Sequence, residues 1–188
     1  MSNYSVIRDI ESTLVNLLWT NFKSDPQIYS DIIGSEKEIT LKSPADMSTE
    51  DEKLSIFLFR ISENAFLKNK KMQKVSAKLL AFPPYPIDLW YLITPITGDI
   101  TKNHILIGKI MQIFHDNAIL KGKDLMDDLS GSTEELRLVE AQLSIEDMTQ
   151  IWNLFRERDY MLSLCYLVTP VIIESTKEIA ARRVIERA

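Results

Sequence analysis

The 188-residue chain has few of the residues that usually carry chemistry: one cysteine, two histidines and five glycines. The glycines are all isolated, so neither a G-x-G-x-x-G nor a G-x-x-x-x-G-K-[ST] phosphate loop is present. Cys165 cannot form an internal disulfide, and its apolar neighbours are typical of a buried structural thiol. These shortages argue against a nucleotide-binding enzyme and against a disulfide scaffold.

The remaining candidates for chemistry are few and far apart. His104 and His115 would lie about 16 Å apart on one predicted helix, too far to share a metal ion. No Gly-x-Ser-x-Gly elbow occurs, and the acidic pairs Asp51-Glu52 and Asp127-Asp128 fall in predicted loops, where hydration is the usual fate of charge. The sequence therefore predicts no enzyme, and no catalytic, cofactor-binding or metal-binding residue.

Long hydrophobic runs are also missing, and the amino-terminal residues lack the basic and apolar regions of a signal peptide. The net charge of −5 disfavours binding to nucleic acid. The clearest basic cluster, Lys68, Lys70, Lys71, Lys74 and Lys78, lacks interleaved aromatics and is typical of a solvated connector. We expect a soluble protein, with neither nucleic acid nor membrane as partner.

One phrase occurs twice. Leu89-Trp90-Tyr91-Leu92-Ile93-Thr94-Pro95-Ile96 returns as Leu164-Cys165-Tyr166-Leu167-Val168-Thr169-Pro170-Val171. Both copies are rich in β-branched and aromatic residues and are apolar on both alternating faces, which predicts two inner strands of a sheet. Because proline offers no N–H to a neighbour, we expect the paired strands to end at Pro95 and Pro170. The repeated tyrosines, Tyr91 and Tyr166, could mark a ligand site or an assembly surface. They are better explained as core residues whose hydroxyls are satisfied at a sheet edge.

The other elements follow from periodicity and end signals. Apolar residues at helical spacing predict helices over Ser5–Lys23 and Thr101–Asn117, and Ser144 with Asp147 resembles a capping box that begins a third helix. Strands are predicted over Leu54–Ile61 and Leu136–Leu143, with a short one over Glu38–Leu41. The fold class is thus α/β (α+β): a mixed sheet of about four or five strands flanked by helices.

At this length, with 45% apolar residues, a single domain is expected. We place it over residues 1–173, and residues 174–188 are then a tail, a helix or an extended arm that could pair with a neighbour.

Four segments together resemble a known family: Leu54–Asn64, Pro83-Pro84 leading into the first repeat, Ile110–Asn117, and the second repeat. The likeness, over roughly Tyr4–Ile173, is to the tail-terminator or cap proteins of extracellular contractile injection systems, which include antifeeding prophages and Photorhabdus virulence cassettes. It implies a phage tail-terminator-like fold and a structural role.

The resemblance also implies partners. It predicts a homo-oligomer, expected to be a hexameric ring, that ends tube and sheath polymerisation and joins the sheath to the inner tube. The particle is expected to assemble in the cytoplasm and can be released. A longer cap paralogue is a further possible partner, and no catalytic residues are carried over. The alternatives are a neck or baseplate adaptor of the same kind of particle, or, with less support, a small ligand-binding protein or hydrolase.

Overall fold

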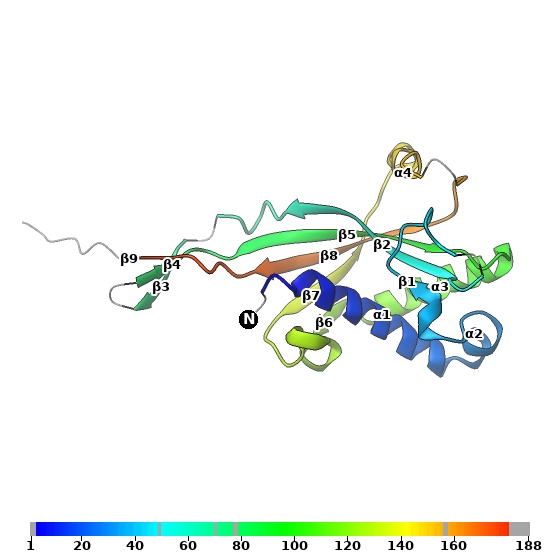
Figure 1. Cartoon of the computed structure of the whole chain (residues 1–188), viewed down its shortest axis with the longest axis horizontal. Coiled ribbons are helices and arrows are strands. Elements are labelled where there is room, and N and C mark those ends of the chain that lie inside the picture. The colour runs from blue at the N-terminus through cyan, green and yellow to red at the C-terminus, as the bar shows by residue number, and fades with distance from the viewer. Residues whose placement is uncertain (1–2, 49, 70, 77–78, 156–157, 181–188) are drawn as a thin grey trace, which may run out of the picture.

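The computed structural model describes residues 3–48, 50–69, 71–76, 79–155 and 158–180, without the side chains of residues 73–75. Its body is a curled six-stranded sheet with helices on both faces, and a small three-stranded sheet extends from one end (Figure 1). The predicted mixed sheet is confirmed, but the strand count of four or five was too low. The strands of the body, in sheet order, are β1 (Ile39–Thr40), β2 (Leu54–Glu63), β5 (Tyr85–Pro95), β8 (Leu164–Ile173), β7 (Glu135–Glu140) and β6 (Ile119–Lys121).

The two copies of the repeated phrase are the central strands β5 and β8, and they pair with each other antiparallel. Tyr91 lies directly opposite Tyr166, so the two copies of the repeat are aligned at their tyrosines. Both strands have a neighbour on each side and layers on both faces, which explains why both need apolar residues at successive positions. The prediction of paired inner strands is therefore confirmed.

The two prolines of the phrase behave differently. β5 ends at Pro95 as expected, whereas β8 continues through Pro170 to Ile173, so the predicted end at Pro170 was wrong. The register shifts there, because Ile87 pairs with Val171 and Leu89 with Val168, which leaves one extra residue on β8. Such a bulge accommodates a residue that cannot donate to the ladder.

A buried polar group holds this bulge. Asn64 is 7% exposed, and its Nδ2 donates to Asp88 Oδ1 at 2.9 Å and to Thr169 Oγ1 at 3.2 Å. The Thr169 hydroxyl also donates to Asp88. These bonds join the residue after β2 to β5 and β8 beside the bulge.

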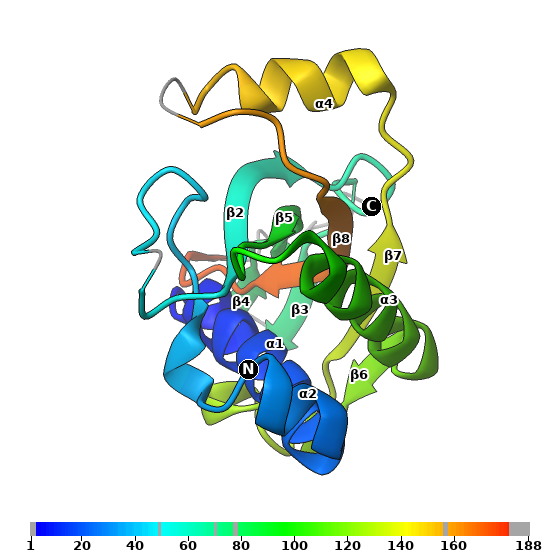
Figure 2. The ribbon, with the colours of Figure 1, turned by 90° about the vertical axis from the view of Figure 1, so that its right-hand side faces the viewer.

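Three helices cover one face of the sheet (Figure 2): α1 (Val6–Ser24), α2 (Pro26–Asp31) and α3 (Ile100–Asp116). α1 and α3 match the predicted helices to within one residue at each end. α2 was missed: Pro26 ends α1, but it also occupies the first turn of a new helix, and the Asp25 side chain caps it by accepting from the N–H groups of Gln27 and Ile28.

The opposite face carries α4 (Ile145–Trp152), which Figure 2 shows beyond the sheet from the other helices. The predicted capping box is present, because Asp147 N–H donates to Ser144 Oγ at 3.1 Å and Ser144 N–H donates to Asp147 Oδ2 at 3.2 Å. Trp152 and Phe155 pack with Leu92 in a small second core on this face. The helix therefore covers only part of the sheet.

Several short elements were missed or shifted. The stretch after α3, in which Asp127-Asp128 were expected to lie in a loop, contains strand β6 and the 3-10 turns Gly122–Asp124 and Asp127–Leu129. A third such turn, Glu36–Glu38, precedes β1. β8 begins at Leu164, the first residue of the second repeat, and the described residues 153–155 and 158–163 lie between it and α4.

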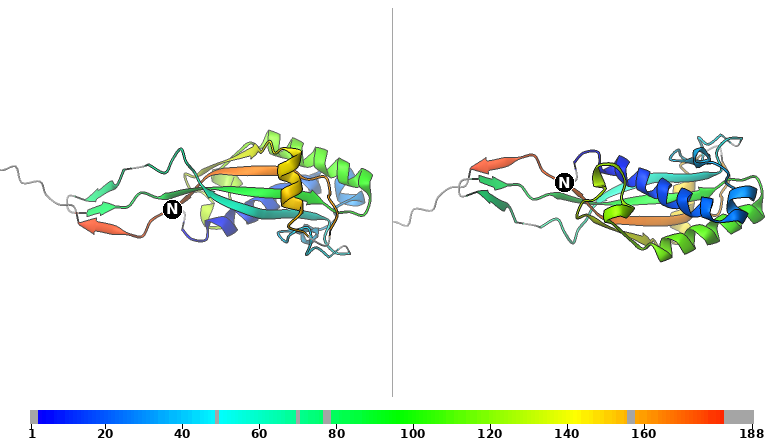
Figure 3. Two further views of the ribbon diagram at one scale, coloured as in Figure 1. Left: turned by 90° about the horizontal axis from the view of Figure 1, so that it is seen from above. Right: turned by 90° about the horizontal axis from the view of Figure 1, so that it is seen from below.

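The lysine-bearing segment is not a plain connector. It forms the hairpin β3 (Gln73–Ser76) and β4 (Leu79–Ala81), and β9 (Glu178–Ala180) adds to β4 as a third strand. Both views in Figure 3 show this second sheet projecting beyond the body. Part of the expected arm is thus an ordered strand, and residues 181–188 lie outside the described residues.

Candidate assembly surfaces

The residues considered for chemistry are dispersed in the structure. His104 and His115 are both exposed on α3, and no cluster of three or more possible metal ligands occurs among the described residues. Cys165 is buried on the central strand, and burial raises the pKa of its thiol to about 11, which suits a structural thiol. No described helix is long and apolar enough to cross a membrane.

The acidic pairs have different environments. Asp51, Asp127 and Asp128 are exposed as expected, but Glu52 is only 9% exposed, so the expectation of hydration was wrong there. Glu52 pairs with Lys42 at 2.9 Å and accepts from the N–H of Ser48 at 2.8 Å. It is a structural carboxylate that organises the loop before β2.

Tyr91 is a core residue, as expected, but its hydroxyl is not satisfied at a sheet edge. It lies on a central strand with 0% exposure, and the hydroxyl has no hydrogen-bond partner among the described residues. Burial, with a smaller contribution from the charge of Glu11, raises the pKa of this phenol well above its ordinary value. Tyr166 packs its ring edge-on against Phe114, with centroids 4.7 Å apart.

We predict that Tyr91→Phe leaves the protein as stable as the wild type or stabilises it by up to about 1 kcal/mol, since phenylalanine keeps the ring and removes a desolvated hydroxyl. Thermal unfolding at neutral pH measures this. Tyr91→Ala, which also removes the ring, should destabilise by about 3–5 kcal/mol. A loss above about 1 kcal/mol in the phenylalanine variant would contradict the assignment of an unpaired hydroxyl.

Three surfaces remain as candidates for assembly, and the first is the projecting sheet. Phe82 N–H donates to Lys177 O at 3.0 Å, and the Lys177 ammonium lies 4.7 Å from the centre of the Phe82 ring. These contacts fix β9 beside the hairpin. Within the basic cluster, Lys68 lies 3.7 Å from Glu63 and Lys71 is exposed, whereas Lys70, Lys78 and the side chain of Lys74 lie outside the described residues.

The second surface is the partly covered face of the sheet beneath α4. A groove of about 390 Å³ runs between this helix and strands β2 and β5, with the Arg60 guanidinium 5.3 Å from the centre of the Trp90 ring. Large apolar side chains are exposed on α4 and the connection that follows it, which is typical of protein-binding surfaces. They are Ile145 (83% exposed), Leu154 (70%), Tyr160 (58%) and Leu162 (51%).

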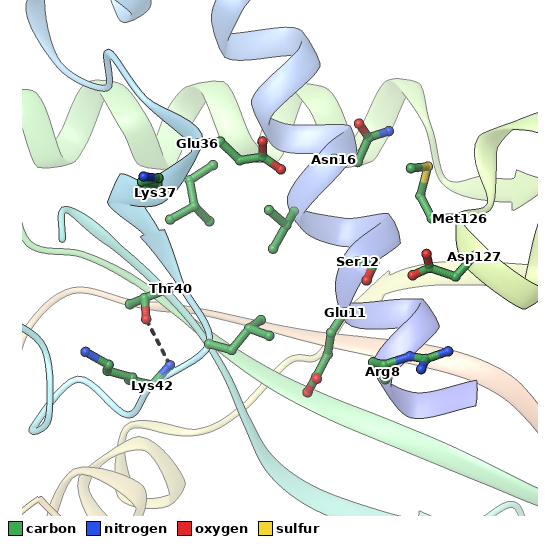
Figure 4. A pocket seen from close by; sticks show the side chains of 13 residues that line it. Arg8, Glu11, Ser12, Asn16, Glu36, Lys37, Thr40, Lys42, Met126 and Asp127 are labelled. Atoms are coloured by element: carbon green, nitrogen blue, oxygen red, sulfur yellow. Dashed lines mark hydrogen bonds between the residues drawn. The ribbon is translucent and has the colours of Figure 1, made fainter. Parts of the chain in front are cut away.

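The third surface is a groove of about 870 Å³ between α1 and the edge strand β1 (Figure 4). The wall formed by α1 contains Arg8, Glu11 and Asn16. The opposite wall contains Thr40 of β1 and Lys42, which lies two residues after the strand. The sequence did not single out this groove, because its two walls come from segments that neither share a motif nor lie close along the chain.

Comparison with known proteins identifies the family. The model of the Pvc16 N-terminal domain matches residues 9–187, nearly the whole chain, whereas no curated protein matches. Two similar structures determined by cryo-EM are the sheath/tube terminator of a PVC extracellular contractile injection system, in its extended state, and the tube-terminating cap of the anti-feeding prophage.

The likeness to both solved proteins extends over the whole of this chain. The TM-score is 0.65 with 17% identity for the terminator and 0.59 with 14% identity for the cap, so what is shared is the fold. The chain covers 65% of the terminator and 62% of the cap, which is less than two thirds of either protein. The predicted kinship with the terminators of contractile injection systems is confirmed by these matches: the chain belongs to the Pvc16 N-terminal domain family.

Proposed function

We propose that this protein is a structural terminator of a contractile injection system, which ends the growth of tube and sheath and joins the two. The observation that carries the proposal is the match of the entire chain to the folds of a sheath/tube terminator and of a tube-terminating cap. The chain acts through protein surfaces rather than through a reaction.

A ring, expected to be hexameric, is the assembly proposed for this task. A ring needs two different surfaces on each copy that meet head to tail. The projecting sheet and the body supply such surfaces, because they lie at opposite ends of the long axis (Figure 1). The exposed apolar residues near α4 offer further contact area for sheath or tube subunits, and a longer paralogue could share the cap.

Length control and position test this proposal. In cells that lack the protein, tubes and sheaths should lose their uniform length, and the wild-type gene should restore it. Particles bearing a labelled copy should carry the label at the end away from the baseplate in electron micrographs. Particles of normal length without the protein, or a label at the baseplate, would reject the terminator role; the second result would favour the adaptor alternative.

A further inference from the structure

The groove between α1 and β1 combines an open strand edge with the Glu11 carboxylate, which has no partner among the residues that the structure describes. β1 forms one edge of the sheet, where Ile39 pairs with Leu54 and Thr40 with Ser55 of β2. Its other side faces the groove, and Leu41, next in the chain, is 40% exposed there. An edge strand offers a row of backbone N–H and C=O groups, to which an extended segment can add.

Glu11 is one of three acidic residues that line this groove, with Glu36 and Asp127. Figure 4 shows its side chain extending from α1 into the space beside β1. It is half-buried, burial raises the pKa of its carboxyl, and it makes no hydrogen bond or ion pair with any residue that the structure describes. A carboxylate that is partly desolvated without a counterion gains most from a cation brought by a partner.

The cations around Glu11 are engaged elsewhere or exposed. Arg8 lies 2.6 Å from Asp9 and 3.6 Å from Asp128, and Lys42 lies 2.9 Å from Glu52. Lys37, at the rim of the groove, is exposed. The groove thus lacks an internal partner for Glu11 among the described residues.

The chain itself contains a segment whose charge and strand-forming residues complement Glu11 and the open edge of β1. Residues 181–188, Ala-Arg-Arg-Val-Ile-Glu-Arg-Ala, carry three arginines together with the β-branched Val184 and Ile185. Fully extended, eight residues span about 26 Å. They follow directly from β9, which lies at the far end of the projecting sheet from α1 and β1 (Figure 1). The complementary groove is therefore that of a neighbouring copy.

We infer that the groove between α1 and β1 binds residues 181–188 of a second copy as a strand added to β1, with an arginine of that segment paired with Glu11. This inference rests on the ring proposed above and names one of its contacts. Donor and acceptor are different surfaces of the chain, so the contact is head to tail and can close into a ring.

Binding of a peptide tests the contact. The acceptor is the full chain with Arg182→Glu, Arg183→Glu and Arg187→Glu, so that its own segment does not compete for the groove. A fluorescent peptide of native residues 178–188, blocked at both ends, should bind it saturably in an anisotropy titration. Adding Glu11→Gln to the acceptor should weaken binding at least tenfold, whereas Glu146→Gln, an exposed glutamate on α4, should leave it unchanged.

Absence of saturable binding, or equal binding by the Glu11→Gln acceptor, would overturn the inference. Thermal unfolding of each variant establishes that it is folded, and Glu11→Gln should fold well because it removes a partly buried charge. Sedimentation of the wild-type chain tests the ring separately. A wild-type ring without peptide binding rejects only the groove contact, and a monomer whose groove still binds the peptide through Glu11 rejects only the ring.

Discussion

Replacing Phe114 by alanine should lower the midpoint of thermal unfolding by roughly 10 °C. Phe114 is 1% exposed on α3, and its ring meets Tyr166 of the central strand β8 edge-on. Truncation of a buried phenylalanine costs about 3–5 kcal/mol, because the apolar burial is lost and the cavity is only partly refilled. Calorimetry or circular dichroism measures the shift.

Met111 on the same helix provides the matched control. It is 38% exposed, so Met111→Ala should change the free energy of unfolding by less than about 1 kcal/mol. If the two substitutions have equal effects, α3 does not lie on the sheet as described. The difference matters for assembly, because α3 and β8 belong to the body that carries the projecting sheet.

Removing residues 174–188 should leave the body folded but abolish the proposed ring and its proposed attachment to the sheath. The core of the body is built from residues before this segment. The free energy of unfolding of the body should therefore change by less than about 1 kcal/mol. The deletion takes away β9, which pairs Ile179 with Leu80 of β4, and leaves a two-stranded hairpin that is marginal by itself. Native mass spectrometry and negative-stain microscopy with sheath subunits measure the result.

Two further variants separate the strand from the segment that follows it. Ile179→Pro removes an N–H from β9 while keeping residues 181–188, and it should also weaken assembly. Ile179→Val keeps the strand and should assemble normally. An unchanged oligomeric state and unchanged sheath attachment after the deletion would show that the segment is not an assembly arm.

Elements with strong local signals were predicted well. Each of these signals arises from contacts within one helix or on the two faces of one strand. Examples are the apolar stripe of α3, the capping box of α4 and the apolar central strands. Strands β3, β4 and β6 were missed, since three or four residues hold too little periodicity to be recognised. α2 was missed for a related reason: Pro26 can equally end one helix or begin another.

The candidate surfaces could not be found in this way. Glu11 is one of several polar residues on a partly exposed helix. Only the fold places it beside β1 with no counterion among the described residues. In the same way, nothing near Glu178–Ala180 indicates that its partner is Leu79–Ala81, almost a hundred positions earlier. Pairing at such a distance depends on how the intervening strands are arranged.

By itself, the sequence determined the class of the fold, its central pair of strands and a family whose motifs are structural. Those features follow from residue type and spacing, because an inner strand must be apolar on both faces wherever it lies. The tertiary structure decided which strands lie at the edges and that β9 completes a second sheet. It also placed Glu11 beside an open edge, where no residue of the described part of the chain serves as its counterion. These features depend on contacts between segments that are distant in the chain. Which charges and hydrogen-bonding groups of a surface have partners is determined only when those segments pack together.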